Sequence, residues 1–192
     1  MSNDELTEHF SNATATFPEL QEALAVIRKN SFGAVWLIGG FVYRSIASML
    51  YGVDRPGVDL DFIIEKPIKN PSSPEGWKAA VNRYGNPKFV KEDGLSIDFV
   101  PLENISSIVR RQLPATIENF LTGTPLNIQS IAYDVSNHKV IGEIGTEALK
   151  SKTVAVNDFD QAAIYAEKKQ KSINDIIQEK AEALGFEPIL TA

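Results

Sequence analysis

The chain of 192 residues contains no cysteine and only two histidines, His9 and His138. The lack of cysteine excludes disulfide bonds, thiolate zinc sites and a cysteine nucleophile. The two histidines stand far apart, each among polar residues, so we expect no zinc site built on them.

Long apolar runs are also missing. No run approaches the roughly 20 residues that a membrane-spanning helix needs, and the polar, acidic N-terminus (1–5) does not resemble a secretory signal. We therefore expect a soluble cytoplasmic protein without membrane association. No G-x-G-x-x-G occurs, which disfavours a Rossmann dinucleotide site, and no G-K-[ST] occurs, which excludes a P-loop.

Basic residues are outnumbered: 19 lysines and arginines stand against 25 acidic residues, for a net charge of −6. A long nucleic acid is usually held by a basic face, so we expect no extended non-specific DNA binding, although a local basic patch stays open. The 43% apolar content suffices for a core, and the length fits one domain or one domain with an appendage.

Strand-like and helix-like patterns are intermixed along the chain. The apolar run 34–38 predicts a buried strand, which Gly39-Gly40 end before a helix over 41–51. A second strand is expected over 60–64, and Asp93-Gly94 predicts a hairpin between 89–90 and 97–100. Further expected elements are helices over 18–30 (capped at Thr16), 75–84, 114–121 and 158–184 (capped at Asp158), strands over 139–141 and 153–156, and turns at Pro56-Gly57 and Ser136-Asn137. The mixture favours an α/β (α+β) fold with a mixed sheet.

Three aspartates stand in these strand-like runs. Asp59 and Asp61 are two residues apart, so their side chains project to the same face of a strand, and Asp98 lies in the later run. Carboxylates among apolar residues are costly unless a positive group neutralises them. Mg²⁺ prefers such oxygen ligands together with substrate phosphates, and two such ions can stabilise a phosphoryl displacement. The pattern therefore predicts a divalent-cation site.

The Gly39-Gly40 pair supplies a second element of phosphate chemistry. Its backbone N–H groups can approach phosphate oxygens, and the helix that follows directs its positive end to the same place. Each feature has a common structural explanation: a solvated strand edge for the Asp-x-Asp, a tight turn for the glycines, the open face of a hairpin for Asp98. Only their combination favours phosphate chemistry.

The segments 37–42, 58–62 and 97–99 resemble the DNA polymerase β-like nucleotidyltransferase superfamily, most closely the head domain of poly(A) polymerases and CCA-adding enzymes. Weaker likeness continues through 126–134, 143–156 and 184–187. The resemblance implies a nucleotidyltransferase fold: an N-terminal helical segment packed on the core (1–32), a head domain (33–156), and a long, neck-like C-terminal helix (157–192).

The resemblance also assigns the candidate residues. It implies Asp59, Asp61 and Asp98 as ligands of Mg²⁺ (or Mn²⁺) and as the catalytic residues, with Asp98 helping to activate the attacking hydroxyl. Gly39 and Gly40 would cradle the triphosphate of an NTP such as ATP. Arg44, near the start of the helix after the glycines, and Lys168, on the C-terminal helix, are candidates for phosphate contacts. The implied reaction transfers an NMP to a hydroxyl with release of pyrophosphate.

The sequence departs from the family at two Arg-Asp pairs. Tyr43-Arg44 and Thr124-Pro125 stand at these positions, which in the family hold the nucleotide and sense the primer. The acceptor therefore stays open between RNA, a protein and a small molecule. Arg110-Arg111 are a candidate acceptor contact or a surface pair, and Trp77 either stacks on a base or packs a short helix.

Two other functions compete with an enzyme. One is a catalytically silent module of the same fold that binds nucleotide, RNA or protein, which the changed Arg-Asp positions favour. The other is one half of a toxin–antitoxin or phage-defence pair. The three acids oppose a silent module, because converging carboxylates repel one another without a metal.

Overall fold

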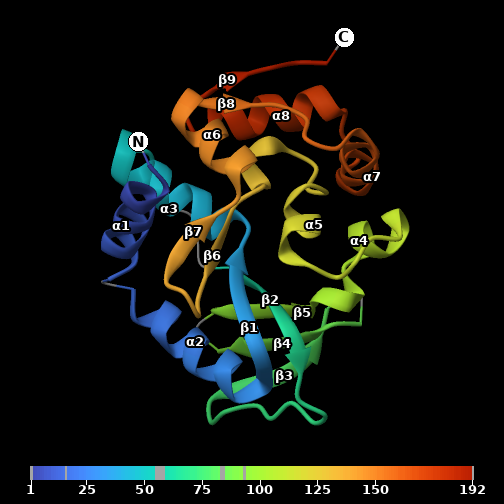
Figure 1. Ribbon diagram of the computed structural model, residues 1–192. Coiled ribbons are helices and arrows are strands. Elements are labelled where there is room, and N and C mark those ends of the chain that lie inside the picture. Colours follow the sequence, from blue (N-terminus) through green and yellow to red (C-terminus); the bar gives the residue numbers. More distant parts are fainter. Residues whose placement is uncertain (1, 16, 55–58, 83–84, 93, 192) are drawn as a thin grey trace.

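The computed structural model describes residues 2–15, 17–54, 59–82, 85–92 and 94–191. Its main feature is a mixed seven-stranded sheet with strand order β3-β4-β5-β2-β1-β6-β7 (Figure 1). The strands are β1 (Ser31–Ile38), β2 (Asp59–Pro67), β3 (Trp77–Val81), β4 (Pro87–Lys91), β5 (Ser96–Pro101), β6 (Ala132–Asp134) and β7 (Lys139–Ile141). Neighbouring strands are antiparallel except β2 and β5, which are parallel.

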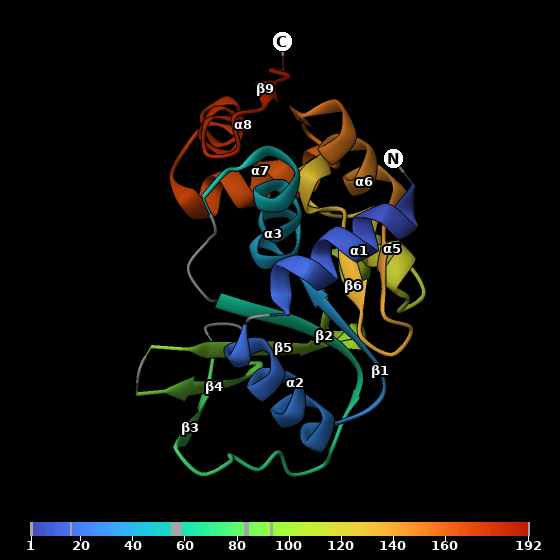
Figure 2. The same cartoon turned by 90° about the vertical axis from the view of Figure 1, so that its left-hand side faces the viewer.

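Helices lie on both faces of this sheet. Figure 1 shows α1 and α3 on one side of β1 and β6, with α4 and α5 on the other, and Figure 2 shows α2 packed across the strands near α1. The helices are α1 (Asn3–Thr14), α2 (Pro18–Asn30), α3 (Gly40–Tyr51), α4 (Ser106–Arg111), α5 (Ile117–Leu121), α6 (Glu143–Ser151), α7 (Phe159–Lys169) and α8 (Ile173–Glu182). A small parallel pair, β8 (Thr153–Val154) and β9 (Glu187–Pro188), lies beside α8. Among the described residues, no helix is long and apolar enough to cross a membrane.

The alternation of side chains along the strands separates two apolar cores. Leu60, Phe62 and Ile64 of β2 join the larger core, which also contains buried residues of α1, α2, α3, α6 and α8. Ile63 points the other way, into a smaller cluster beneath α4 and α5. The smaller cluster comprises Trp36, Ile63, Leu102, Ile105, Ile108, Ile117, Leu121 and Ala132. The face that carries it also carries the candidate site.

Most elements agree with the sequence patterns. The strands over 34–38, 60–64 and 139–141, the helices over 41–51 and 114–121, and the antiparallel pairing across the 93–94 turn are confirmed, although several boundaries differ. Asp158 caps α7 as expected by accepting the N–H of Gln161. Thr16, Pro56-Gly57 and Asp93 lie outside the described residues. The N-cap of α2 is Phe17, which makes no side-chain cap hydrogen bond.

Two expected helices are wrong. The segment 75–84 contains strand β3, because Trp77 packs in the larger core and donates its indole N–H to Glu22, while β3 pairs with β4. This tertiary pairing outweighs a weak local preference for helix. Trp77 is therefore a packing residue.

The single long helix expected over 158–184 is instead two helices, α7 and α8. Gln170 ends α7 in the left-handed conformation, with φ of 54°. Ser172 then starts α8 through a capping box with Asp175. Because α8 starts only a few residues after α7 ends, the two helices do not form one continuous helix. The domain boundaries at 32/33 and 156/157 stay predictions.

Candidate active site

The parallel pair β2–β5 brings the three aspartates to one face of the sheet. Asp61 stands opposite Asp98 in the register, and Asp59 stands opposite Ser96. Register partners on neighbouring strands share a face, as do residues two apart on one strand. Asp59, Asp61 and Asp98 therefore lie on the face that is covered further along by α4 and α5. Asp59 is exposed, whereas Asp61 and Asp98 are partly buried.

Two of these carboxylates have polar partners within the protein. The Ser96 hydroxyl donates to Asp59 Oδ1 at 3.0 Å. Lys88 Nζ donates to Asp98 Oδ2 at 2.7 Å, and Asn82 Nδ2 donates to Asp98 Oδ1 at 3.1 Å. Both oxygens of Asp98 thus accept hydrogen bonds from neighbouring strands or their ends.

The electrostatics of Asp61 differ from those of its neighbours. Burial, followed by the charges of Asp98 and Asp59, raises the pKa of Asp61 to about 6, and the charge of Lys88 opposes this rise. Removing the Asp61 proton at neutral pH therefore creates a buried negative charge beside two other carboxylates. A bound cation would stabilise this charge. Among the described residues, no three acidic or histidine side chains converge closely enough to hold one ion as they stand.

The end of β1 brings Gly39 against Asp61. Ile38 pairs with Asp61 in the antiparallel register, and Gly39 follows as the N-cap of α3 with φ of 78°. A Cβ at Gly39 would lie 2.9 Å from Asp61 Oδ2, so both the backbone angle and the close approach require glycine here. The N-terminus of a 12-residue helix therefore begins beside the acidic face.

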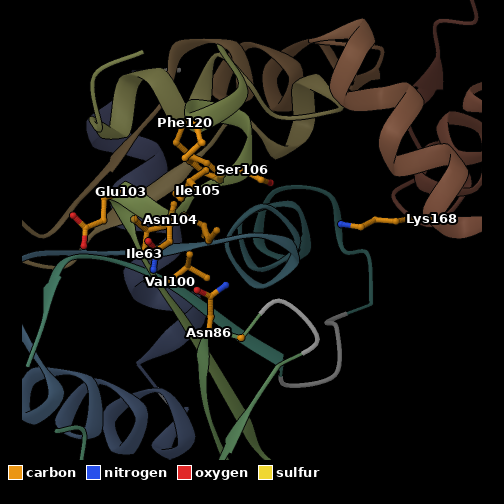
Figure 3. A pocket seen from close by; sticks show the side chains of 12 residues that line it. Ile63, Asn86, Val100, Glu103, Asn104, Ile105, Ser106, Phe120 and Lys168 are labelled. Carbon is orange, nitrogen blue, oxygen red and sulfur yellow. The ribbon is translucent and has the colours of Figure 1, made fainter. Parts of the chain in front are cut away.

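Two adjoining cavities open on this face. The smaller, of about 310 Å³, is lined by Gly39 and Asp61 together with Arg110, Gln161 and Lys168. The larger, of about 640 Å³, is lined by both apolar and polar side chains and is shown in Figure 3. Both cavities are lined by Ile38, Ile105, Ser106, Phe120 and Lys168, so they form one cleft.

Known structures share this architecture. A CCA-adding enzyme solved with ATP matches with a TM-score of 0.56 and 15% identity, over 89% of this chain and 46% of that one. A CCA-adding enzyme with CTP matches with a TM-score of 0.51 and 14% identity, over 81% and 37%. The Thermotoga maritima CCA-adding enzyme complexed with tRNA matches with a TM-score of 0.50 and 14% identity, over 94% and 46%.

The chain has a CCA-adding-enzyme-like nucleotidyltransferase fold. Identities this low establish the fold alone. The chain spans less than half the length of these three proteins. No family model matches the sequence, and no curated protein matches it.

Within this nucleotidyltransferase fold, the two basic residues predicted to contact phosphate, Lys168 and Arg44, lie differently with respect to the cavities. Lys168 of α7 lines both cavities, and Figure 3 shows its side chain extending from the helix toward the other lining residues. Arg44 of α3 is partly buried and is not among the residues that line either cavity. Phosphate contact thus has geometric support at Lys168 and none at Arg44.

Sequence reasoning gave no role to Lys88 and left Arg110 between two alternatives. Arg110 lines the smaller cavity and donates to Gln161 on α7, whereas Arg111 donates to the carbonyl groups of Ser107 and Asn119 and braces the α4–α5 connection. The signal for Lys88 was present: β4 and β5 pair across the 93–94 turn, and this places Lys88 opposite Asp98.

Tyr43 and Thr124 stand where the family has its Arg-Asp pairs, and in this chain both side chains are buried. Tyr43 is buried in the larger core. Thr124 is buried as well, and its hydroxyl bonds to the hydroxyl of Ser130 at 2.6 Å and to the carbonyl of Leu126 at 3.1 Å. These side chains contribute packing at positions where the family places charged groups.

Proposed function

We propose that the chain is a divalent-cation-dependent nucleotidyltransferase that moves an NMP from an NTP to a hydroxyl acceptor. The observation that carries this proposal is the in-register placement of Asp59, Asp61 and Asp98 on one sheet face beside Gly39. The nucleotidyltransferase fold, found in CCA-adding enzymes solved with ATP and with CTP, supports it.

The residues present fit a hard divalent cation. Asp59 and Asp61 offer carboxylate oxygens, and Asp61 is partly buried beside two further carboxylates with its pKa raised to about 6. Mg²⁺ or Mn²⁺ would be held by Asp59 and Asp61, with Asp98 beside them on the next strand. When bound, the cation would neutralise negative charge on the phosphates of the nucleotide.

The chain's own groups supply the remaining tasks. Backbone N–H groups at Gly39 and Gly40 face the phosphates at the positive end of α3. Arg110 and Lys168 add positive charge on the wall of the smaller cavity. Asp98 accepts a hydrogen bond from the acceptor hydroxyl. The hydroxyl oxygen then bonds to the α-phosphorus, the bond from that phosphorus to the pyrophosphate oxygen breaks, and the hydroxyl proton passes to Asp98 and from there to water.

The larger cavity is the place for the acceptor. It adjoins the carboxylates through Ile63 and Val100, which lie two residues beyond Asp61 and Asp98 on their strands. RNA is the first acceptor to test, because a similar structure is that of a CCA-adding enzyme complexed with tRNA. A protein or a small hydroxylated molecule is tested next.

A silent binding module is the second candidate. It is favoured by the two hydrogen bonds that already occupy Asp98 and by the use of Tyr43 and Thr124 in packing. Such a module would bind nucleotide, RNA or a protein partner, including a partner in a toxin–antitoxin or phage-defence pair, without forming a new phosphoester bond.

Label transfer separates the two functions. The pure protein is incubated with each α-labelled NTP, Mg²⁺ or Mn²⁺, and RNA or cell extract. The enzyme is expected to label an acceptor, and Asp59→Asn or Asp61→Asn should each lower the rate by about 100-fold or more. Asp160→Asn, an exposed change on α7, is the control and should leave the rate unchanged. Nucleotide binding without transfer, unaffected by the first two substitutions, would favour the silent module.

A further inference from the structure

Asp98 differs from the other two carboxylates because the protein supplies it with a cation. Lys88 Nζ lies 2.7 Å from Asp98 Oδ2. The side chains of Lys88 and Asp98 are 28% and 21% exposed, in contrast to the exposed pair Lys78–Glu92 at 77% and 82%. Partial burial limits solvent screening, so the Lys88–Asp98 pair is held more firmly than a surface ion pair.

The sheet fixes this pair from two directions. Lys88 is the register partner of Asp98 across the antiparallel β4–β5 ladder, so the two side chains emerge side by side on one face. The amide of Asn82, just beyond β3, donates to the other carboxylate oxygen of Asp98 at 3.1 Å. Two donors on adjoining segments thus hold Asp98 in place without a metal ion.

The charges on this face determine how much positive charge is needed to neutralise them. Asp59, Asp61 and Asp98 carry three negative charges when ionised, and the Lys88 ammonium neutralises one of them. Two negative charges remain, which one divalent cation balances. A second divalent cation at Asp98 would have to displace Lys88 or stand next to its positive charge, and both cost free energy.

We propose that Lys88 acts as a fixed ammonium in the position of a second cation, so that the acidic face takes up one divalent cation, held by Asp59 and Asp61. Lys88 is then a positioning residue: it holds Asp98 toward the cleft and keeps it from becoming a metal ligand. This inference rests on the cation site of the proposed function and sets its stoichiometry.

Mn²⁺ binding to the whole chain at pH 7.5, followed by electron paramagnetic resonance of the free ion, tests the stoichiometry. The wild type is expected to bind one Mn²⁺. Lys88→Gln removes the positive charge beside Asp98 and is expected to bind two, whereas Lys88→Arg keeps the charge and is expected to bind one. Lys91→Gln is the matched control: Lys91 is on the same strand with similar exposure, but pairs with Glu22 of α2, and this variant is expected to bind one.

A second measurement uses the carboxylates themselves. Asp98→Asn is expected to keep the single Mn²⁺, with its dissociation constant changed by no more than about threefold, whereas Asp61→Asn is expected to abolish binding. Equal Mn²⁺ numbers in the wild type and Lys88→Gln, a wild-type number other than one, or loss of binding in Asp98→Asn would overturn the inference. Label transfer is measured separately, so an active enzyme that binds two Mn²⁺ would refute the role of Lys88 and leave the proposed function intact.

Discussion

Asp61 is the residue at which burial and charge oppose each other most clearly. It lies beside the end of β1, with Gly39 close to one of its oxygens and two carboxylates as neighbours. Burial is the main cause of its raised pKa, and the charges of Asp98 and Asp59 add to it. A carboxylate with these surroundings makes the stability of the metal-free protein sensitive to pH.

We expect metal-free protein to lose stability as the pH rises. The Asp61 pKa is raised from 3.8 to about 6 on folding, so the folded chain binds this proton more tightly than the unfolded chain. The resulting stabilisation is fully present below about pH 4 and is lost as pH rises through about 6. Between these values the free energy of unfolding should fall by on the order of 2 to 3 kcal/mol more in the wild type than in Asp61→Asn.

Urea unfolding in a chelator at several pH values measures this difference. Subtracting the Asp61→Asn curve removes the contribution of the other titrating groups. Parallel curves for the two proteins would show that Asp61 keeps an ordinary pKa in the folded state.

Single residues show how far the sequence predicts this site. The period of two in a strand placed Asp59 and Asp61 together without any structure. Lys88 needed one further step, the register of the β4–β5 hairpin, because only pairing brings it opposite Asp98. The position of Arg44 outside the linings of both cavities could not be read from the sequence, because it depends on how α3 packs.

At the scale of elements, helix α3 is flanked by two glycines that both have a positive φ. Gly39 precedes the helix with φ of 78°, and Gly52 follows it with φ of 70°. A Cβ at Gly39 would meet Asp61 Oδ2 at 2.9 Å, whereas a Cβ at Gly52 would meet nothing within 4 Å. Both positions have a positive φ, but ψ is −158° at Gly39 and 20° at Gly52, so the backbone at Gly39 is the more demanding of the two. Only Gly39 adds a clash with the candidate site.

We therefore expect the two alanine substitutions to separate stability from function. Gly52→Ala should lower the free energy of unfolding by about 1 kcal/mol and leave NTP binding unchanged, because only backbone strain is added. Gly39→Ala should cost at least as much stability and should also weaken NTP binding by about tenfold or more, since it displaces Asp61. Urea unfolding and equilibrium nucleotide binding check both variants. Equal NTP binding by Gly39→Ala and Gly52→Ala would show that the close approach of Gly39 to Asp61 does not affect nucleotide binding.

Elements were predictable where local pattern and tertiary packing agree. The α3 segment has both an apolar helical pattern and glycines at its ends, and its prediction is confirmed. Strand β3 and the break at Gln170 were missed for opposite reasons. The first is imposed by a distant partner strand, and the second by a left-handed residue that has no glycine signal.

At the scale of the whole molecule, the two faces of the sheet are packed unequally. The larger core joins α1, α2, α3, α6 and α8 to the sheet, whereas α4 and α5 rest on the smaller cluster beside two cavities. α4 and α5 are also short, with six and five residues. Helices α4 and α5, which form a wall of the cleft, thus rest on fewer buried apolar residues than the helices on the opposite face of the sheet.

We expect amide hydrogen exchange to follow this inequality. Peptides from α4 and α5 should exchange at least about tenfold faster than peptides from α3 and β2, because local opening exposes fewer apolar contacts. Exchange followed by mass spectrometry measures the rates, and adding NTP with Mg²⁺ should slow α4 and α5 selectively if the cleft binds nucleotide. Uniform protection across all four elements would contradict the argument.

The parallel pairing between β2 and β5 in the large sheet also limits how this chain can vary in length. Side chains on β5 alternate between the apolar core and the acidic face, so one residue inserted between Ser96 and Asp98 would turn Asp98 toward Phe62 and Phe89. A single-codon insertion in β5 would therefore remove the Asp98 carboxylate from the face that carries Asp59 and Asp61.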